Sequence, residues 1–331
     1  MPVPQATSDH YREQQRLAVV VLTAARASWR ELRGGRWERS WRDQLPDVAV
    51  VVAAGMYAAA NSADGYVGAV LDETGQASDT SATLNPMAFA QVSPAGFPVE
   101  STLAQPLLAT VGAFEGGRSP AESLALGGRL LDSTVLTMMA DVGRSAVATA
   151  IAARPGIGGY VRMLNPPSCS RCVVQAGRWF RWNQGFERHP RCDCRHIPSS
   201  EGMASDLRLS PSKYFERLPR SEQDRVFTGA GAEAIRAGAD VSQVVNARRG
   251  MSTATQNVRG WIPSGRLARV DVFGRPVAVS SEGTTRRGIA SRERTGRNLS
   301  QRLMPESIFE IAESRDDAIK MLTLHGYLAA A

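Results

Sequence analysis

The sequence predicts a mainly helical α+β fold. The first half contains long segments with apolar residues at helical spacing, most clearly over 119–153. Short β-type runs occur only around 160–197 and 268–279, and every cysteine lies within 169–194. We therefore expect a helical N-terminal region, a small central β-hairpin element that contains the cysteines, and C-terminal helices plus a β-hairpin.

Length, charge and apolar runs limit the classes of protein to which this chain can belong. The chain has 331 residues and a net charge of +7, so it is long enough for two or three domains and is moderately basic. The N-terminus, Met1 to Gln5, lacks the charged and apolar regions of a signal peptide. The longest apolar run, Val48 to Ala60, is shorter than the roughly 20 residues that span a bilayer. We expect no membrane partner and a buried helix at this run.

The N-terminal region is expected to begin with a disordered lead over residues 1–8. Ser8 and Asp9 offer an N-cap to the first helix of a helical region that covers 9–154. Trp37 and Trp41 are four residues apart, so they should share one buried helix face rather than form a nucleic-acid stacking platform.

Two further signals divide this helical region. Residues 74–101 are rich in Ser, Thr, Pro and Gly without a sustained period, which predicts a long exposed loop. Ser119, Pro120 and Glu122 form a capping box with proline at the first helical position, and the helix they start should run to about Ala153.

The cysteine stretch indicates a metal site. Cys169 and Cys172 form a Cys-x-x-Cys, and His189, Cys192 and Cys194 supply further soft ligands within a few residues. Zinc in structural sites takes four Cys or His ligands in a tetrahedron. Without an export signal, thiolates on a metal are favoured over two disulfides. The strand from Cys192 to Ile197 and a hairpin made by 172–176 and 178–182 should carry these ligands.

The ligand set has more than four candidates. The preferred set is Cys169, Cys172, Cys192 and Cys194, with His189 as a strong substitute for one of the last two. His196 is a weaker candidate. A site filled by four protein ligands is structural rather than catalytic, so we expect a structural Zn as the cofactor.

The C-terminal part should contain short helices and a hairpin. We expect helices over 230–239 and 241–249, the second capped by Asp240, and a β-hairpin that pairs 268–272 with 277–279. The arginine-rich segment 284–302 should be exposed or lie on a partner. The tail, 305–326, should form two helical pieces, the second capped at Ser314.

These residues carry a family resemblance. The order Cys-x-x-Cys, Gly177, His-Pro-x-Cys-x-Cys resembles the signature of the phage Mu F-like minor head proteins, also called phage head morphogenesis proteins. The runs 244–251 and 303–308 and the late His325-Gly326-Tyr327 are similar to versions carried by phages of actinobacteria. The likeness covers about residue 155 to the end. The family usually has Arg where this chain has Asp193.

The resemblance implies a virion protein. It predicts a Mu F-like domain over 155–283 that contains the Cys/His cluster 169–196, followed by an arginine-rich linker and helical tail over 284–331. It also implies a structural minor capsid protein inside the phage head, reached through the host cytoplasm during assembly. The implied partners are the portal protein and the major capsid or scaffold proteins, and segment 284–302 is a candidate contact for packaged DNA.

Two other function classes compete with this interpretation. Some relatives are described as capsid maturation proteases, but the sequence has no His-Glu-x-x-His and no Gly-x-Ser-x-Gly, so we do not expect an enzyme. The second alternative is a basic nucleic-acid-binding protein that is stabilised by a structural zinc. The arginines are dispersed except over 284–302, and such binding would have to weaken steeply with salt.

Overall fold

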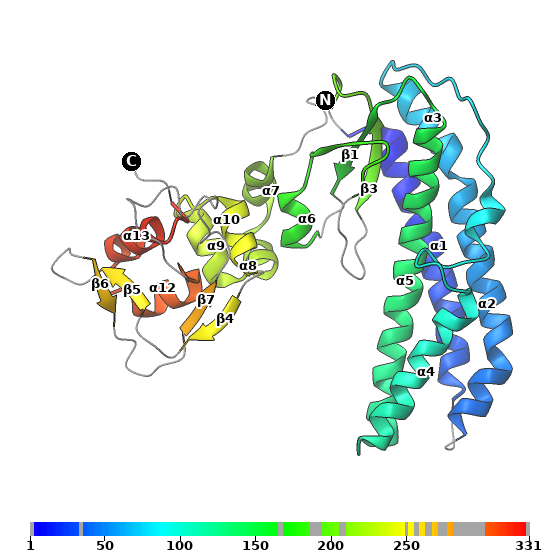
Figure 1. Ribbon diagram of the computed structural model, residues 1–331, viewed down its shortest axis with the longest axis horizontal. Helices are drawn as coiled ribbons and strands as arrows, with labels where there is room; N and C mark the ends of the chain where they lie inside the picture. The colour runs from blue at the N-terminus through cyan, green and yellow to red at the C-terminus, as the bar shows by residue number, and fades with distance from the viewer. Residues whose placement is uncertain are drawn as a thin grey trace. The chain divides into compact units, whose positions relative to one another are not determined.

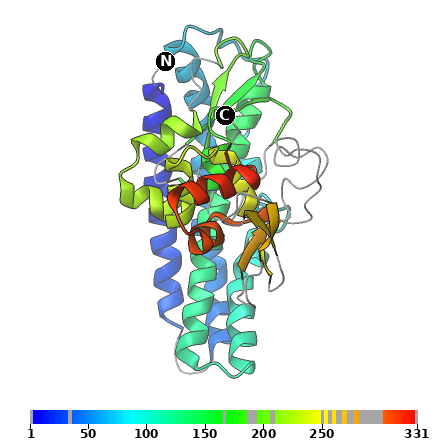
Figure 2. The same ribbon diagram turned by 90° about the vertical axis from the view of Figure 1, so that its left-hand side faces the viewer.

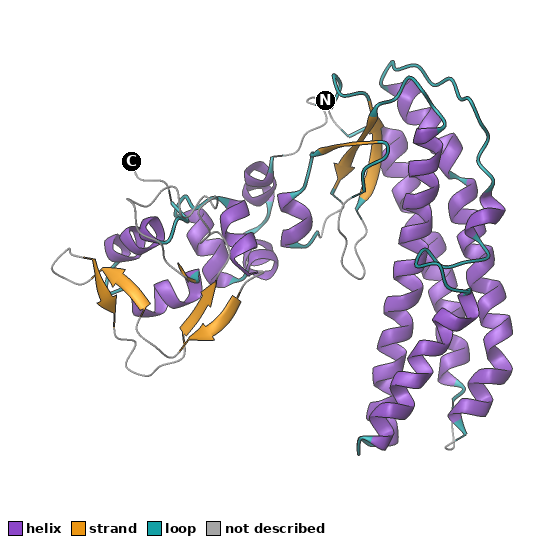
Figure 3. Cartoon of the chain, in the orientation of Figure 1, coloured by secondary structure: helices purple, strands orange, loops and turns teal. Residues whose placement is uncertain are grey.

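The computed structural model describes residues 3–32, 36–164, 168–185, 194–204, 210–248, 251–254, 258–261, 267–270, 277–280 and 302–328. Helix makes up 66% and strand 8%, which confirms the predicted mainly helical α+β class. Figure 3 shows the strands as small groups among the helices.

The chain divides into two compact units. Unit 1 comprises Met1–Asn165 and Gly177–Arg208, and unit 2 comprises Pro166–Ala176 and Leu209–Ala331. The division therefore runs through the cysteine stretch, not between 154 and 155 as the expected domain boundary did. A short excursion, 166–176, belongs to the second unit because its helix packs on helices that come later in the chain.

Unit 1 is built on long helices. Its helices are α1 (Gln5–Arg30), α2 (Trp37–Asn61), α3 (Ala63–Glu73), α4 (Val99–Glu115) and α5 (Pro120–Ala152), with a 3₁₀ turn η1 (Pro86–Phe89). The four longest run alongside one another in both views (Figures 1 and 2), and every pair among α1, α2 and α5 is in contact. Their facing sides form one apolar core.

Tryptophans fix one end of this bundle. Trp37 and Trp41 are both buried on one face of α2, as their spacing predicts. The indole of Trp41 packs edge-on against Trp29, with ring centroids 5.0 Å apart, and its Nε1 donates a hydrogen bond to the carbonyl of Leu103 at 3.1 Å. A buried indole N–H needs such a partner, so this contact joins α2 to α4.

The start of α5 follows the predicted signal. Ser119 accepts from the backbone N–H of Glu122, and the Glu122 carboxylate accepts from the backbone N–H of Ser119 at 3.0 Å. The capping box and the proline at N1 are therefore both present, and the helix ends at Ala152, one residue before the expected end.

The beginning of the chain differs from the expectation. Helix α1 starts at Gln5, so residues 5–8 belong to the helix and not to a disordered lead. The carboxylate of Glu73, at the end of α3, accepts the backbone N–H groups of Gln5 and Ala6 at 2.6 and 3.0 Å. A tertiary partner thus satisfies the first N–H groups, and no cap at Ser8 and Asp9 is needed.

The segment expected as an exposed loop over 74–101 is largely a loop, but α4 begins inside it at Val99. Two hydrogen bonds hold this loop against other parts of unit 1. The backbone N–H of Ser81 donates to the carbonyl of Ala153 at 2.8 Å, and Gln76 accepts from the N–H of Ser200 at 2.8 Å.

Length and composition also make two segments candidate membrane spans, Trp37–Glu73 and Pro120–Ala152. The apolar window of the second is 61% buried inside the protein and that of the first 39%. A core helix of a bundle passes the same test, and Val52 and Met56 of the expected buried run are fully enclosed.

A three-stranded antiparallel sheet covers one end of unit 1. Its strands β1 (Gly159–Met163), β2 (Trp179–Arg181) and β3 (Arg195–Ser199) have the order β2-β1-β3. The predicted hairpin of 172–176 with 178–182 is wrong. Residues 170–174 form a short helix, and β2 pairs with β1. Burial of Cys172 and Val173 overrides the strand propensity of the Val-Val pair.

Unit 2 combines short helices and short strands. Its helices are α6 (Ser170–Val174), α7 (Pro211–Arg217), α8 (Arg220–Phe227), α9 (Gly229–Arg236), α10 (Val241–Ala247), α12 (Pro305–Ile311) and α13 (Arg315–Leu324). Its strands are β4 (Met251–Ala254), β5 (Val258–Trp261), β6 (Leu267–Val270), β7 (Val277–Ser280) and β8 (Arg302–Leu303).

The strand pairing in unit 2 corrects a second prediction. β6 pairs with β5, whereas β7 lies between β4 and β8, so the expected hairpin of 268–272 with 277–279 does not form. The caps are as predicted, because Asp240 accepts from Gln243 and Ser314 accepts from Asp317. Pairing partners are set over long range, whereas caps depend on neighbours in sequence.

Candidate metal centre

The five predicted ligands fall in three places. Cys169 and Cys172 lie on α6 in unit 2, and Cys194 directly precedes β3 in unit 1. His189 and Cys192 lie outside the described residues. Among the residues that the structure describes, no group of three or more Cys, His, Asp or Glu side chains is arranged to hold a metal. The complete ligand set therefore remains a prediction.

The Cys-x-x-Cys occupies one helical turn. Cys169 is the N-cap residue of α6 and is exposed, and Cys172 lies within the helix with a relative exposure of 3%. The two sulfurs of the motif are therefore carried by the extended N-cap position and by the first turn of the same short helix. Just before it, the backbone N–H of Ser168 donates to the hydroxyl of buried Tyr214 at 3.3 Å, which holds the turn to α7.

Cys194 lies in a different environment, fully enclosed in unit 1. A guanidinium nitrogen of Arg162, on the neighbouring strand β1, donates to its sulfur at 3.4 Å. Arg144, on α5, donates to its carbonyl oxygen at 3.1 Å. A charged donor at the sulfur favours the thiolate, which is the form that binds metals.

Buried arginines surround this cysteine. Arg144, Arg162 and Arg195 are all buried, and each lies on an element of unit 1 that meets at the cysteine. Arg144 forms an ion pair with Asp141 one turn earlier on α5, and Arg195 donates to the carbonyl of Ala140 at 3.4 Å. Buried cations require negative or acceptor partners. The sulfur of Cys194 supplies such an acceptor beside Arg162.

The chemistry of this donor set fits a structural metal ligand. Metal-binding thiolates are held and tuned by hydrogen bonds from outside the first coordination shell, and Arg162 makes such a bond. The enclosure of Cys172 and Cys194 leaves them poorly placed to react with a large substrate.

The weaker candidate, His196, has a packing role. Its ring stacks on Tyr160 with centroids 3.9 Å apart, and its carbonyl accepts from the hydroxyl of Tyr66 at 2.7 Å. His196 and Ser145 also line a pocket of about 250 Å³.

His10 and Tyr66 extend the buried polar cluster. Their rings stack with centroids 4.1 Å apart and an interplanar angle of 7°. The pKa of His10 is lowered from 6.5 to about 4, first because burial penalises the charged ring and second because Arg195 is nearby. Burial raises the pKa of the Tyr66 phenol well above its ordinary value. Both groups are neutral near pH 7.

This histidine predicts a pH dependence of stability. As the pH falls from 6.5 towards about 4, the unfolded chain binds a proton at position 10 that the folded chain does not. The free energy of unfolding should therefore decrease in this window. His10→Phe, which keeps an aromatic ring on Tyr66, should flatten this decrease in urea unfolding experiments at the two ends of the window. Equal pH slopes for the two proteins would contradict this assignment.

Sequence reasoning missed the arginine cluster and His10. In a chain with so many arginines, nothing local distinguishes Arg144, Arg162 and Arg195 from solvated residues. The only indication was their position, because two of them lie on strands that flank the cysteine stretch.

Unit 2 joins two of the segments that carry the family resemblance. Arg248, from the 244–251 run, forms an ion pair with Glu306, from the 303–308 run. Thr228 connects to both, because its hydroxyl contacts Glu306 at 3.2 Å and also accepts from Arg248. Thr228 has a φ of 67°, which is rare for a β-branched residue. Contacts from both segments hold this strained position.

No protein-family model, no curated protein and no solved structure matches this chain. The family resemblance therefore rests on the motif residues themselves.

Proposed function

We propose that the chain is a structural minor capsid protein of a tailed phage, associated with the portal inside the head. In this role it supports head assembly, DNA packaging or ejection. The observation that carries the proposal is the ordered Cys-x-x-Cys, glycine and His-Pro-x-Cys-x-Cys stretch, together with the downstream runs 244–251 and 303–308. The ion pair between Arg248 and Glu306 supports a common structural role for those runs.

The metal in this proposal is a structural zinc. Cys169 and Cys172 supply two ligands, and two of His189, Cys192 and Cys194 supply the others. Zinc bound by four protein ligands contributes folding free energy and keeps no open position for a substrate. The enclosure of Cys172 and Cys194 supports this structural use over a reactive one.

Partner surfaces are proposed for each end of the chain. In unit 1, large apolar side chains are exposed on the outer faces of α1 and α2, which suits docking on the portal, major capsid or scaffold proteins. They are Val19, Val20, Val50, Val51 and Tyr57. We propose that packaged DNA contacts the residues of segment 284–302 other than Arg302. The expectation that the whole segment is exposed is wrong for Arg302, which is 1% exposed.

The buried position of Arg302 has a clear cause. Its guanidinium lies 4.6 Å from the ring centroid of Tyr327 and donates to carbonyl oxygens of Gln243 and His325. These partners fix it within unit 2, so it is not available to a phosphate. The rest of segment 284–302 lies outside the described residues.

Quantitative mass spectrometry of purified virions tests this proposal. The protein should be present in the particle, in few copies, at a constant ratio to the portal protein, and should remain with empty heads or leave with the DNA. Absence from purified virions, with presence only in the lysate of infected cells, would contradict the proposed role.

A further inference from the structure

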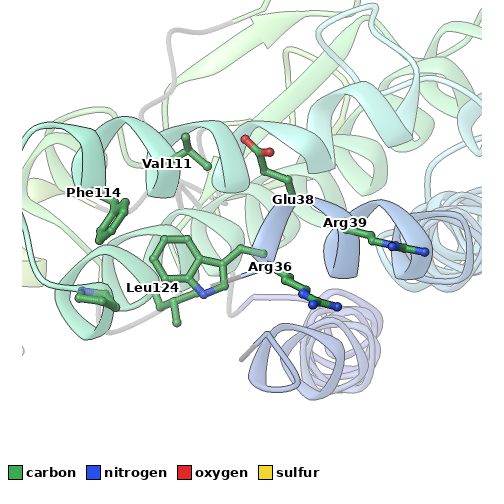
Figure 4. A pocket seen from close by; sticks show the side chains of 8 residues that line it. Arg36, Glu38, Arg39, Val111, Phe114 and Leu124 are labelled. Atoms are coloured by element: carbon green, nitrogen blue, oxygen red, sulfur yellow. The ribbon is translucent and has the colours of Figure 1, made fainter. Parts of the chain in front are cut away.

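A pocket opens at the end of the unit 1 bundle that carries the tryptophans. It has a volume of about 560 Å³ and lies between the start of α2, the end of α4 and the start of α5. Apolar side chains form most of its wall, and three charged residues border it (Figure 4). The lining residues are Arg36, Trp37, Glu38, Arg39, Val111, Phe114, Pro120 and Leu124. Its volume lies within the range typical of ligand pockets.

The apolar wall is held in place before any ligand arrives. Trp37 packs edge-on against Phe114, with centroids 5.3 Å apart and an interplanar angle of 80°. The carbonyl of Leu124 accepts from the Trp29 indole at 3.2 Å, which fixes the first turns of α5. Pro120 is the first residue of that helix and has a restricted φ. A preformed wall lowers the entropic cost of binding.

The wall is apolar and partly open to solvent. Phe114 is 48% exposed, although its ring forms one side of the pocket. An aromatic side chain left exposed beside a hollow is typical of a surface that receives an apolar group from outside.

The border of the pocket carries a net positive charge. Arg36, Glu38 and Arg39 are all exposed; the two arginines lie on the side of the pocket away from Phe114, and the Glu38 carboxylate points toward Val111 (Figure 4). Neither arginine forms an ion pair with any residue that the structure describes. Two guanidinium groups beside an apolar hollow are suited to carboxylates that flank an apolar anchor.

We propose that this pocket binds an acidic peptide segment of a partner protein. One bulky apolar side chain of the segment fills the hollow against Trp37, Phe114 and Leu124, and neighbouring carboxylates pair with Arg36 and Arg39. The openness of the site at Phe114 fits the side chain of a larger partner better than a small molecule, which a pocket usually encloses. The proposal concerns unit 1 alone and depends on neither the zinc nor the proposed virion role.

Fluorescence polarisation with the full chain tests the proposal. The probe is a fluorescein-labelled hexapeptide, Asp-Asp-Trp-Leu-Asp-Asp, and the comparison peptide has Gly-Gly at the centre. The first should bind saturably and weaken when ionic strength rises, and the second should not bind. The double variant Arg36→Glu/Arg39→Glu should weaken binding by about tenfold or more, since two attractive charge pairs become repulsive.

Matched variants separate the pocket from general charge. Arg16→Glu/Arg129→Glu changes the net charge of unit 1 equally at exposed positions outside the pocket and should alter affinity by less than about twofold. Val111→Trp, which fills the hollow, should abolish binding while the circular dichroism spectrum is retained.

Four outcomes would overturn the proposal. The first is no binding of the Trp-Leu peptide. The second is equal binding of the Gly-Gly peptide. The third is an equal loss of affinity in both charge-reversed variants. The fourth is competition by free N-acetyltryptophan at the same concentration as the peptide, which would assign the pocket to a small aromatic acid.

Discussion

Cys169→Ser is expected to produce a protein that purifies without stoichiometric metal and unfolds far more readily. Cys169 is at the start of the α6 turn, where its side chain is exposed, so the substitution itself leaves no cavity in a core. The loss comes from the zinc, whose binding contributes on the order of 10 kcal/mol in small zinc modules. Zinc per chain, measured by inductively coupled plasma mass spectrometry, and limited proteolysis over 160–200 report the two effects.

Ser170→Ala is the matched control for this substitution. It changes a residue between the two cysteines, on the same turn, without removing a sulfur ligand. It should keep its zinc and its protease resistance. If Cys169→Ser and Ser170→Ala behave alike, the Cys-x-x-Cys does not hold a metal.

Zinc per chain also decides which two of His189, Cys192 and Cys194 are metal ligands. Single substitutions His189→Ala, Cys192→Ser and Cys194→Ser should include two that lose zinc and one that keeps it. Cys194→Ser should destabilise unit 1 in either case, because it removes the sulfur that accepts from Arg162.

Gly127→Ala is expected to destabilise the bundle by about 3 kcal/mol, at the upper end of the usual overpacking cost. A Cβ at this position would lie 1.9 Å from the Thr110 hydroxyl, 2.6 Å from the Trp29 ring and 2.8 Å from the carbonyl oxygen of Pro106. The Pro106 oxygen is backbone and also accepts from Thr110, so it cannot move aside cheaply. Helices α4 and α5 would have to separate. Thermal and urea unfolding of the full chain measure the cost.

Gly112→Ala, on the neighbouring helix, is expected to change the stability in the opposite direction. Gly112 lies on α4, and a Cβ there would meet nothing within 4 Å. Alanine in an exposed helix should stabilise by about 0.5–1 kcal/mol relative to glycine. Two glycine-to-alanine changes of opposite sign would establish that α4 and α5 approach each other closely at Gly127. A neutral Gly127→Ala would contradict this packing.

Local signals in the sequence predicted the helical part of the fold well. The capping box at Ser119 and Glu122 and the caps at Asp240 and Ser314 depend on residues three apart, so they can be identified without tertiary information. The shared face of Trp37 and Trp41 follows from helical periodicity in the same way.

Features that depend on distant partners could not be predicted. Gln5 starts a helix because Glu73 accepts its N–H. Arg302 is buried because its guanidinium donates to the carbonyl of Gln243 and lies over the ring of Tyr327. The pairing of β7 with β4 and β8 likewise joins segments separated by many residues. Local propensity carries no information on such contacts.

The sequence predicts which residues belong to the candidate site, but not how these residues are divided between the two units. The sequence indicated which side chains suit a metal, yet it did not indicate that Cys169 and Cys172 belong to one compact unit and Cys194 to the other. It also gave no sign that Arg162 donates to the sulfur of Cys194. The arginines around Cys194 come from separate elements, so their cluster becomes visible only in the folded chain.

X-ray absorption spectroscopy at the zinc edge of the full chain, purified under reducing conditions, tests the central claim most directly. A structural site predicts about one zinc per chain with Zn–S distances of about 2.3 Å and a shell of four sulfurs, or three sulfurs and one imidazole nitrogen. A protein without zinc, or a zinc whose shell is mainly oxygen and nitrogen with a water position, would contradict a closed structural centre.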